Sequence, residues 1–165
     1  MDKLLEELGA YELLNNLLPG AIICILLQWQ TGFHLPETNV VGDLCIFYFM
    51  GLVVDRLGSL LVEPIYKKLN IISKGAYEDF IQASQADPKI DTLSTKSNMY
   101  RTFSTVFIVS ITYIIIEFFI SQTNVRCLIL KLFISTILLV LFSYSYRKQS
   151  RYIQKRIDRQ ISCHR

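Results

Sequence analysis

Charged side chains are scarce in this sequence of 165 residues. They make up 19% of the chain, against about 25% in an ordinary soluble domain, while 52% of the residues are hydrophobic. The excess of apolar residues is concentrated in long runs, which excludes an ordinary soluble globular protein. The absence of repeats and low-complexity tracts excludes a disordered chain, a collagen and a coiled coil. The length allows one domain at most.

Cysteine patterns and common catalytic motifs are also missing. The four cysteines stand at positions 24, 45, 127 and 163, without a CxxC pair or a cluster with histidine. Two of them lie inside apolar runs and are expected to be buried thiols, so neither a disulfide framework nor a zinc site is predicted. No P-loop, GxGxxG, HExxH or GxSxG motif is present. We therefore expect no metal and no cofactor.

Long apolar runs are the main feature that is present. Phe103 to Ile120 carries one charge, Glu117, and Cys127 to Tyr146 carries one charge, Lys131. Each run is close to the roughly 20 residues that a helix needs to cross a hydrocarbon layer of about 30 Å. The short connection between the runs predicts a tight turn. Segment 103–146 is therefore expected to form a transmembrane helical hairpin.

Two further runs are weaker candidates for membrane segments. Val41 to Glu63 is apolar apart from a few charges and is expected to stop at Pro64, whereas Leu17 to Trp29 is short. Segment 17–63 is therefore predicted to contain the first two membrane segments. The whole chain is then expected to be an all-α integral membrane protein with about four transmembrane helices. The alternative is two spans joined to a re-entrant or interfacial N-terminal half.

Basic residues are distributed unevenly along the chain. Segment 64–102 holds six lysines and arginines and segment 147–165 holds seven, whereas residues 31–42 hold none. Basic loops stay on the cytoplasmic side of a membrane, so both termini and segment 64–102 are expected in the cytoplasm. The first apolar run lacks the basic start and the cleavage site of a removable signal peptide.

Segments outside the apolar runs have helical patterns. Residues 1–16 predict an acidic amphipathic helix that packs on protein. Segment 64–102 predicts a helix around Tyr77 that breaks at Asp87-Pro88 and is followed by a second helix running from about residue 89 into the third span. Residues 147–165 predict a basic helix that continues the fourth span. The cations on one face of this helix are Lys148, Arg151, Lys155 and Arg159. They predict contacts with lipid headgroups or, alternatively, with RNA or an acidic protein.

Ionisable side chains inside apolar runs are costly unless paired or hydrated, so each is a functional candidate. Glu117 and Lys131 lie at equal distances from the hairpin turn and are predicted to be in contact. Asp43, at the start of the second span, is expected in the same layer, which in a ring of subunits would favour cations. A purely structural pair and a helix-start role for Asp43 are the alternatives.

A seam of small and polar residues is predicted along the second span. Its members are Gly51, Asp55, Gly58, Ser59, Val62 and Glu63, with Arg56 next to Asp55. Small residues permit close helix approach, and the charges need protein or water in front of them instead of lipid. A homo-oligomeric pore with a hydrated centre satisfies charges at several depths more easily than a compact monomer, and is therefore favoured over it.

Arg159 and His164, near the C-terminal end, have the spacing R-x4-H. This spacing is typical of HEPN-type RNases, in which the His transfers a proton and the Arg stabilises phosphate charge. Gln160 stands where an Asn, Asp or His usually follows this Arg. A short multi-span layout that ends in a basic helix with R-x4-H resembles the small membrane accessory proteins of type VI-B CRISPR systems.

This resemblance covers the layout and one motif. It implies an oligomeric pore in the bacterial inner membrane that depolarises the infected cell and acts with an RNA-guided RNase. Arg159 and His164 would then serve subunit packing or gating. Two other functions stay open, a membrane-anchored RNase and a non-catalytic membrane adaptor. The RNase is less favoured, because no second acid or base accompanies His164.

Overall fold

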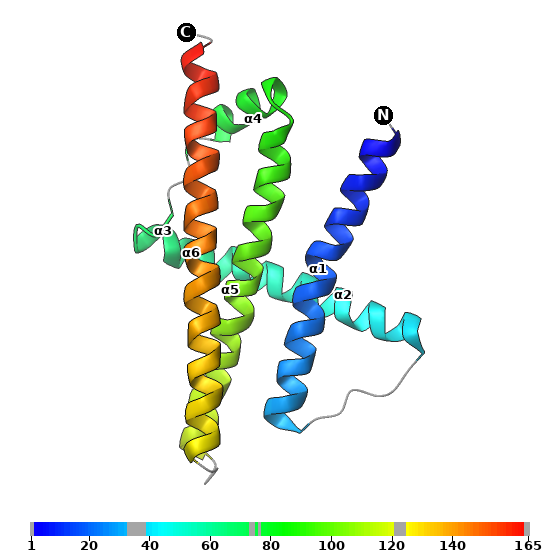
Figure 1. Ribbon diagram of the computed structural model, residues 1–165, viewed down its shortest axis with the longest axis vertical. Helices are drawn as coiled ribbons and strands as arrows, with labels where there is room; N and C mark the ends of the chain where they lie inside the picture. Colours follow the sequence, from blue (N-terminus) through cyan, green and yellow to red (C-terminus); the bar gives the residue numbers. More distant parts are fainter. Residues whose placement is uncertain (1, 33–38, 73–74, 76, 121–124, 164–165) are drawn as a thin grey trace.

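The computed structural model describes residues 2–32, 39–72, 75, 77–120 and 125–163, with side chains between Asn15 and Ser162. Its elements are α1 (Asp2–Thr31), α2 (Val40–Leu57), the π turn η1 (Gly58–Val62), α3 (Glu63–Lys68), α4 (Tyr77–Ala86), α5 (Lys89–Ile120) and α6 (Val125–Cys163) (Figure 1). These residues contain helices and no strand. The all-α prediction is therefore confirmed.

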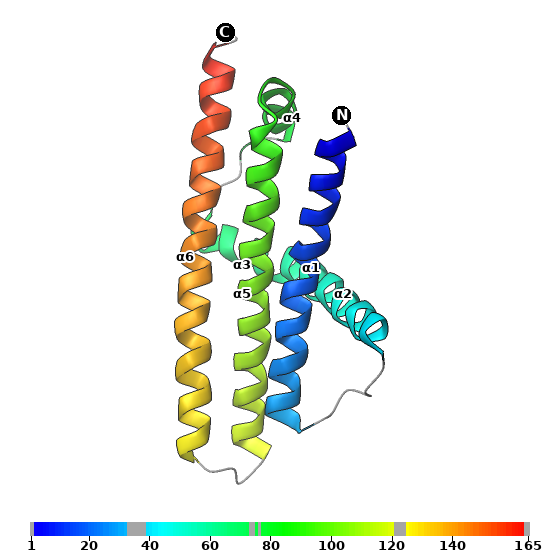
Figure 2. The same ribbon diagram turned by 45° about the vertical axis from the view of Figure 1, so that its right-hand side comes forward.

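The long helices are arranged in two packed pairs. α5 and α6 form an antiparallel hairpin, and α1 runs alongside α5 (Figures 1 and 2). α2, η1 and α3 make one continuous helical stretch, which crosses the other long helices instead of running beside them (Figure 1). The most extensive contacts join α5 to α6 and α1 to α2. α5 links the pairs, because it contacts α1 and α2 as well as α6.

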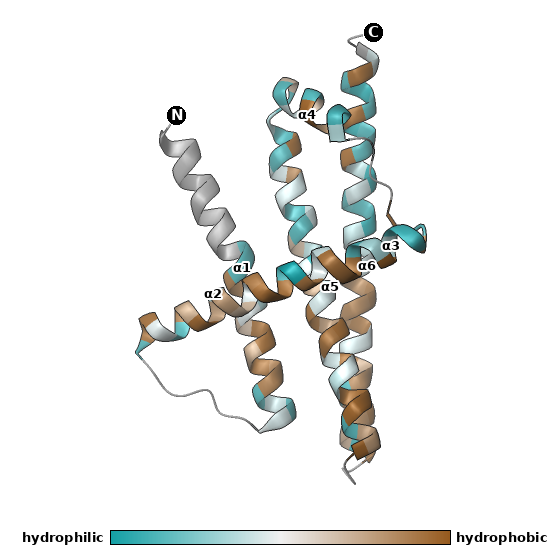
Figure 3. Ribbon diagram, turned by 180° about the vertical axis from the view of Figure 1, so that it is seen from behind, coloured by the Kyte–Doolittle hydropathy of each residue, from teal (hydrophilic) through white to brown (hydrophobic). Residues whose placement is uncertain are grey.

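α5 and α6 change character along their length. Their ends at the hairpin turn are hydrophobic, whereas their opposite ends are hydrophilic and pack with α4 (Figure 3). Residues 103–120 and 125–146 are called the apolar half below. The head is α4 together with residues 89–100 of α5 and 147–162 of α6.

Three helical stretches are long and apolar enough to cross a membrane. They are Val40–Lys68, Lys89–Ile120 and Val125–Ser162. The apolar part of α1, Leu17 to Trp29, is shorter than the roughly 20 residues that a span requires. Over the described residues the chain is therefore all-helical with three candidate spans, and four spans remain a prediction.

Two helices are longer than the segments that the sequence predicts. Residues 1–16 and the run that follows them form one helix, α1, which continues through Pro19. Pro19 is fully buried, and this packing offsets the helical hydrogen bond that the proline ring removes. The second apolar run continues past Pro64 to Lys68, because Pro64 lies in the first turn of α3, where a missing amide hydrogen is best tolerated.

The other predicted boundaries agree with the structure. α4 ends at Ala86, directly before Asp87-Pro88, and α5 runs from Lys89 into the apolar half without a break. α6 likewise continues from the apolar half into the basic tail. Cys24 is buried as expected, whereas Cys45 and Cys127 are exposed on the surfaces of α2 and α6.

Among the described residues, buried apolar side chains form three small cores. The first joins α1, α2 and α5, the second joins η1 and α3 to α6, and the third lies in the head. Their central residues are, in that order, Ile23, Val54 and Val106; Val62, Tyr66 and Tyr146; and Ala83, Ile90 and Ile157. The head thus has a core of its own, separate from the packing of α1 on α2.

Candidate functional sites: a buried ion network and a head pocket

Arg101 is the centre of a buried ion network between the α2–α3 stretch and α5. Its Nη1 donates to Glu63 Oε2 at 2.8 Å, and its Nη2 donates to Asp55 Oδ1 at 2.8 Å. The Thr102 hydroxyl donates to the same Asp55 oxygen at 2.9 Å, and Lys67 Nζ lies 3.1 Å from Glu63 Oε1. One chain therefore supplies counter-charges for both carboxylates of the predicted seam.

The π turn explains why two carboxylates eight positions apart reach one guanidinium. In a regular α-helix, residues eight apart differ by roughly 80° in direction, at about 100° per residue. The wider i→i+5 turn at Gly58–Val62 rotates the chain less per residue and so reduces this difference. Asp55 and Glu63 can then face Arg101 together. π turns of this kind are frequent at functional sites.

The small residues of the seam bring helices into close contact, as predicted. A Cβ atom on Gly51 would lie 1.9 Å from the carbonyl oxygen of Asn16 in α1, and one on Gly58 would lie 2.6 Å from Thr105 Oγ1 in α5. Arg56 lies outside this seam, because its side chain is exposed. Ser59 is partly buried. The structure therefore separates Arg56 from the network that holds Asp55.

Glu117 and Lys131 form the contact that their symmetric spacing predicts. Lys131 Nζ lies 3.7 Å from Glu117 Oε2, with side-chain exposures of 12% and 13%. Lys131 also lies over the ring of Trp29, 5.6 Å from its centroid. Asp43 lies in the first turn of α2, and α2 begins away from the hairpin end of α5 and α6, at which this pair lies (Figures 1 and 2). The predicted three-residue layer is therefore reduced to a pair.

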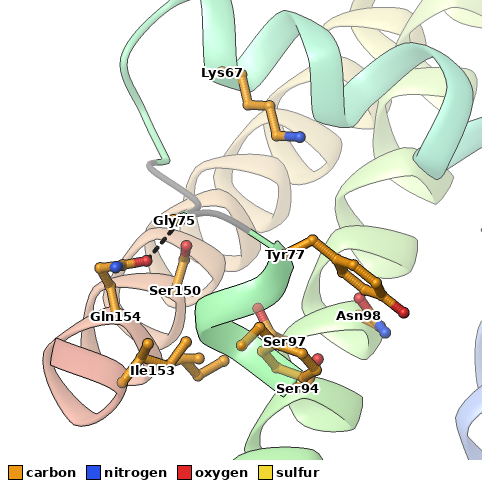
Figure 4. A pocket seen from close by; sticks show the side chains of 11 residues that line it. Lys67, Gly75, Tyr77, Ser94, Ser97, Asn98, Ser150, Ile153 and Gln154 are labelled. Atoms are coloured by element: carbon orange, nitrogen blue, oxygen red, sulfur yellow. Dashed lines mark hydrogen bonds between the residues drawn. The ribbon is translucent and has the colours of Figure 1, made fainter. Parts of the chain in front are cut away.

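A pocket of about 360 Å³ lies in the head between α4, α5 and α6 (Figure 4). Tyr77 and Phe80 supply aromatic rings, and Lys67 reaches its edge from α3. The polar lining comes from α5 and α6, with Ser94, Ser97, Asn98, Ser150 and Gln154. Volumes of roughly 300–1,000 Å³ with a few convergent polar groups are typical of small-molecule sites.

Sequence reasoning missed this pocket. The helical stripe at Tyr77 and Phe80 was visible, but its partners lie on α6, about seventy positions away. Gln154 shows this long-range closure directly, because its Oε1 accepts a hydrogen bond from the Gly75 amide at 2.8 Å (Figure 4). A pocket built from such separate segments leaves no local signal in a sequence.

Asp87 fastens the turn between α4 and α5 to α6. Its Oδ1 accepts a hydrogen bond from the Lys89 amide at 3.1 Å, and its Oδ2 accepts one from Arg156 Nε. The hydrogen bond from Arg156 is the main reason that the pKa of Asp87 lies below its ordinary value of 3.8. This clamp fixes one end of the head.

The basic tail is seen up to Cys163. Arg159 is exposed and borders a pocket of about 320 Å³ with Asp87, Tyr152 and Arg156. His164 lies outside the described residues, so the R-x4-H geometry stays a prediction. The other predicted cations, Lys148, Arg151 and Lys155, are exposed and border a further groove on α6.

Neither a metal site nor a similarity to known proteins identifies a further function for this chain. Within the part of the chain that the structure describes, no three His, Cys, Asp or Glu side chains are grouped as metal ligands. No protein-family model, curated protein or solved structure matches this chain.

Proposed function

We propose that this chain is a membrane-anchored receptor without enzymatic activity of its own. Its head pocket receives a small polar ligand that carries an anionic group, and the α5–α6 hairpin transmits binding to the apolar half. One observation carries the proposal: the two helices that line most of the pocket run unbroken into that half. Each is a single helix, so a displacement at one end is passed along a stiff element.

The lining of the pocket indicates the chemistry of the ligand. Tyr77 and Phe80 offer flat apolar surfaces, and Asn98 can both donate and accept hydrogen bonds. Lys67 is the one cation in the described lining and favours an anionic group. A ligand with a planar part, hydrogen-bonding edges and one negative group fits this combination.

Lys67 also connects the pocket to the ion network. Its ammonium group lies 3.1 Å from Glu63 and borders the pocket. An anionic ligand would compete with Glu63 for this cation and leave Glu63 to Arg101 alone. Asn98 provides a second connection, since its backbone carbonyl oxygen lies 3.0 Å from the Thr102 hydroxyl and shares that hydroxyl's proton with Asp55. Ligand binding is thereby linked to the crossing of α2 over α5.

An oligomeric pore is the second candidate function. Pairing of Asp55, Glu63 and Glu117 within one chain means that unpaired carboxylates no longer argue for a ring. The observation that favours a pore is Arg56, an exposed charge on the largely apolar helix α2, which needs water, a headgroup or another subunit. Together with the resemblance to the type VI-B accessory proteins, it supports a pore in the bacterial inner membrane that acts with an RNA-guided RNase.

Ligand binding by the intact protein tests the first proposal. Purified full-length chain in detergent would be melted with a panel of nucleoside monophosphates and dicarboxylates as probes. We expect one class of probe to raise the Tm of the wild type and of the control variant Tyr152→Ala, whose ring lies outside the pocket. Tyr77→Ala and Lys67→Gln should lose this shift. A shift that survives both pocket variants would contradict the proposal.

Ion flux and RNA cleavage separate the other functions. The receptor predicts tight liposomes without ligand, whereas a constitutive pore releases ions from them. Particle symmetry in electron micrographs gives an independent answer, because a ring with an axial opening favours the pore. RNA that is cut by the wild type and left intact by Arg159→Ala and His164→Ala would instead support an RNase.

A further inference from the structure

A basic groove lies on α6 where the head meets the apolar half. It has a volume of about 510 Å³ and is bordered by four cations and two tyrosines: Arg147, Lys148, Arg151, Lys155, Tyr144 and Tyr152. Leu93 of α5 forms part of its wall, and the Gln149 amide donates to the Leu93 carbonyl at 3.3 Å. The described lining contains no carboxylate, so the groove attracts anions.

The height of the groove on α6 matches the headgroup layer of a bilayer. Phe133, Val140 and Leu141 are exposed on the apolar half, and Tyr144 follows with 66% of its surface exposed. Measured from Tyr144 at 1.5 Å per residue, the backbone of Arg147 lies about 4 Å further along α6 and that of Arg151 about 10 Å further. Helical side chains tilt toward the N-terminal end of their helix, which for α6 is the apolar half, so both guanidinium groups can reach back toward the boundary. Headgroups occupy roughly the first 5–8 Å beyond the hydrocarbon on each side, and tyrosine is enriched at that boundary.

Within the described part of the chain, the cations of this groove are not paired with a carboxylate. Among the described ion pairs, Arg156 is bound to Asp87 and Arg101 to two carboxylates, whereas none involves Arg147, Lys148, Arg151 or Lys155. Arg147 Nε is in addition a buried donor without a hydrogen-bond partner. Arg147 also borders the groove, and a phosphate group offers the oxygen pair that a guanidinium fits best.

We propose that this groove binds the phosphate group of an anionic phospholipid. Arg147 and Arg151, one turn apart on α6, hold the phosphate, while Tyr144 contacts the glycerol region and the acyl chains continue over Val140 and Leu141. A lipid is favoured over a nucleic acid because the cationic surface is continuous with this exposed apolar one. The site is separate from the head pocket, so it does not depend on the proposed receptor function.

The test measures lipid retention by the full-length protein. Native mass spectra would be recorded from detergent containing phosphatidylglycerol or phosphatidylcholine, for the wild type and for Arg147→Gln/Arg151→Gln. Each basic residue near an anionic surface contributes about 1 kcal/mol, so the double variant should bind phosphatidylglycerol roughly thirtyfold more weakly. Helicity measured by circular dichroism would establish that the variant is folded, and Arg151→Gln alone should give an intermediate loss.

Matched controls make the result decisive. Lys89→Gln/Arg159→Gln removes the same charge from the far end of the head and should retain phosphatidylglycerol like the wild type. An equal loss in this control would overturn the proposal, because binding would then follow net charge alone. Displacement of the lipid by millimolar inorganic phosphate would identify a free-anion site instead. Stronger competition from a short single-stranded RNA than from phosphatidylglycerol would overturn the lipid assignment as well.

Discussion

Arg101 illustrates how much a single buried charge can control. Its side chain is 7% exposed and is hydrogen-bonded to two carboxylates, which are themselves 21% and 11% exposed. Removing one partner of a buried ion pair costs about 3–5 kcal/mol, because the remaining charge keeps its desolvation cost without compensation. We therefore expect Arg101→Gln to lower the free energy of unfolding by about that amount, measured by denaturation of the protein in detergent.

Arg56 is the matched control for this measurement. It stands next to Asp55 in the sequence, yet its side chain is exposed. Arg56→Gln should lower the unfolding free energy by much less than Arg101→Gln, because its removal leaves no buried carboxylate without a partner. Similar losses in both variants would mean that Asp55 is not paired in the way described here.

Asp87 gives a pH-dependent prediction at the same scale. Its folded-state pKa lies below the ordinary value of 3.8, mainly because of the hydrogen bond from Arg156. A carboxyl group with a lowered pKa stabilises the folded state above its unfolded pKa, and this contribution is lost as the pH falls through the folded pKa. Asp87→Asn should therefore weaken the head at neutral pH and have no effect at the acid end of the titration.

Hydrogen exchange of the α4 amides measures this local effect. Faster exchange in Asp87→Asn at pH 7, with the difference vanishing in acid, is the expected result. Asp91→Asn is a suitable control, because Asp91 lies in the first turn of α5 with an exposed side chain. A pH-independent difference between Asp87→Asn and the wild type would contradict the proposed clamp.

The crossing of α1 over α2 depends on two glycines. Gly20 and Gly51 each leave room for a backbone carbonyl of the other helix, at positions where a Cβ atom would come within 1.7 and 1.9 Å. Backbone atoms cannot yield, so the helices themselves must separate. We expect Gly51→Ala to destabilise the protein by about 1–3 kcal/mol, the usual cost of overpacking, as measured by thermal unfolding.

Gly58→Ala serves as the comparison at the element scale. The closest atom to an added methyl group there is Thr105 Oγ1, at 2.6 Å, which belongs to a side chain. A side chain can rotate where a backbone cannot, so the loss should be smaller than for Gly51→Ala. The reverse order would show that α1 and α2 do not cross at Gly51.

Periodicity predicted some elements better than others. The breaks around α4 and the uninterrupted course of α5 and α6 followed from Asp87-Pro88 and from the absence of proline in the two long helices. The helix stop expected at Pro64 was wrong, because Pro64 lies in the first turn of α3, directly after the π turn. Pro19 likewise lies inside α1, where its burial lets the helix continue. These effects depend on tertiary contacts, which a local pattern does not contain.

Across the whole molecule, an ion pair could be predicted from the sequence only where its two residues lie at equal distances from a turn. The Glu117–Lys131 contact follows from a short hairpin, in which depth is fixed by distance from the turn. Arg101 was counted with the basic residues of segment 64–102, because its partners are 38 and 46 positions away. The direction of the α2–α3 stretch across α5 brings them together, and nothing in the local sequence specifies that direction.

The arrangement of the molecule in a membrane can be tested from its two ends. Val125 begins α6 at the hairpin turn with 57% of its surface exposed, and Tyr77 lies in the head with 75% exposed. In a background with all four cysteines replaced by serine, Val125→Cys should react with a membrane-impermeant maleimide added outside intact cells. Tyr77→Cys should react only after the membrane is permeabilised, because basic segments stay on the cytoplasmic side. Reaction of both variants from outside would exclude a spanning α5–α6 hairpin. Reaction of Tyr77→Cys alone from outside would place the basic head on the outer face, against the distribution of charge that the sequence contains.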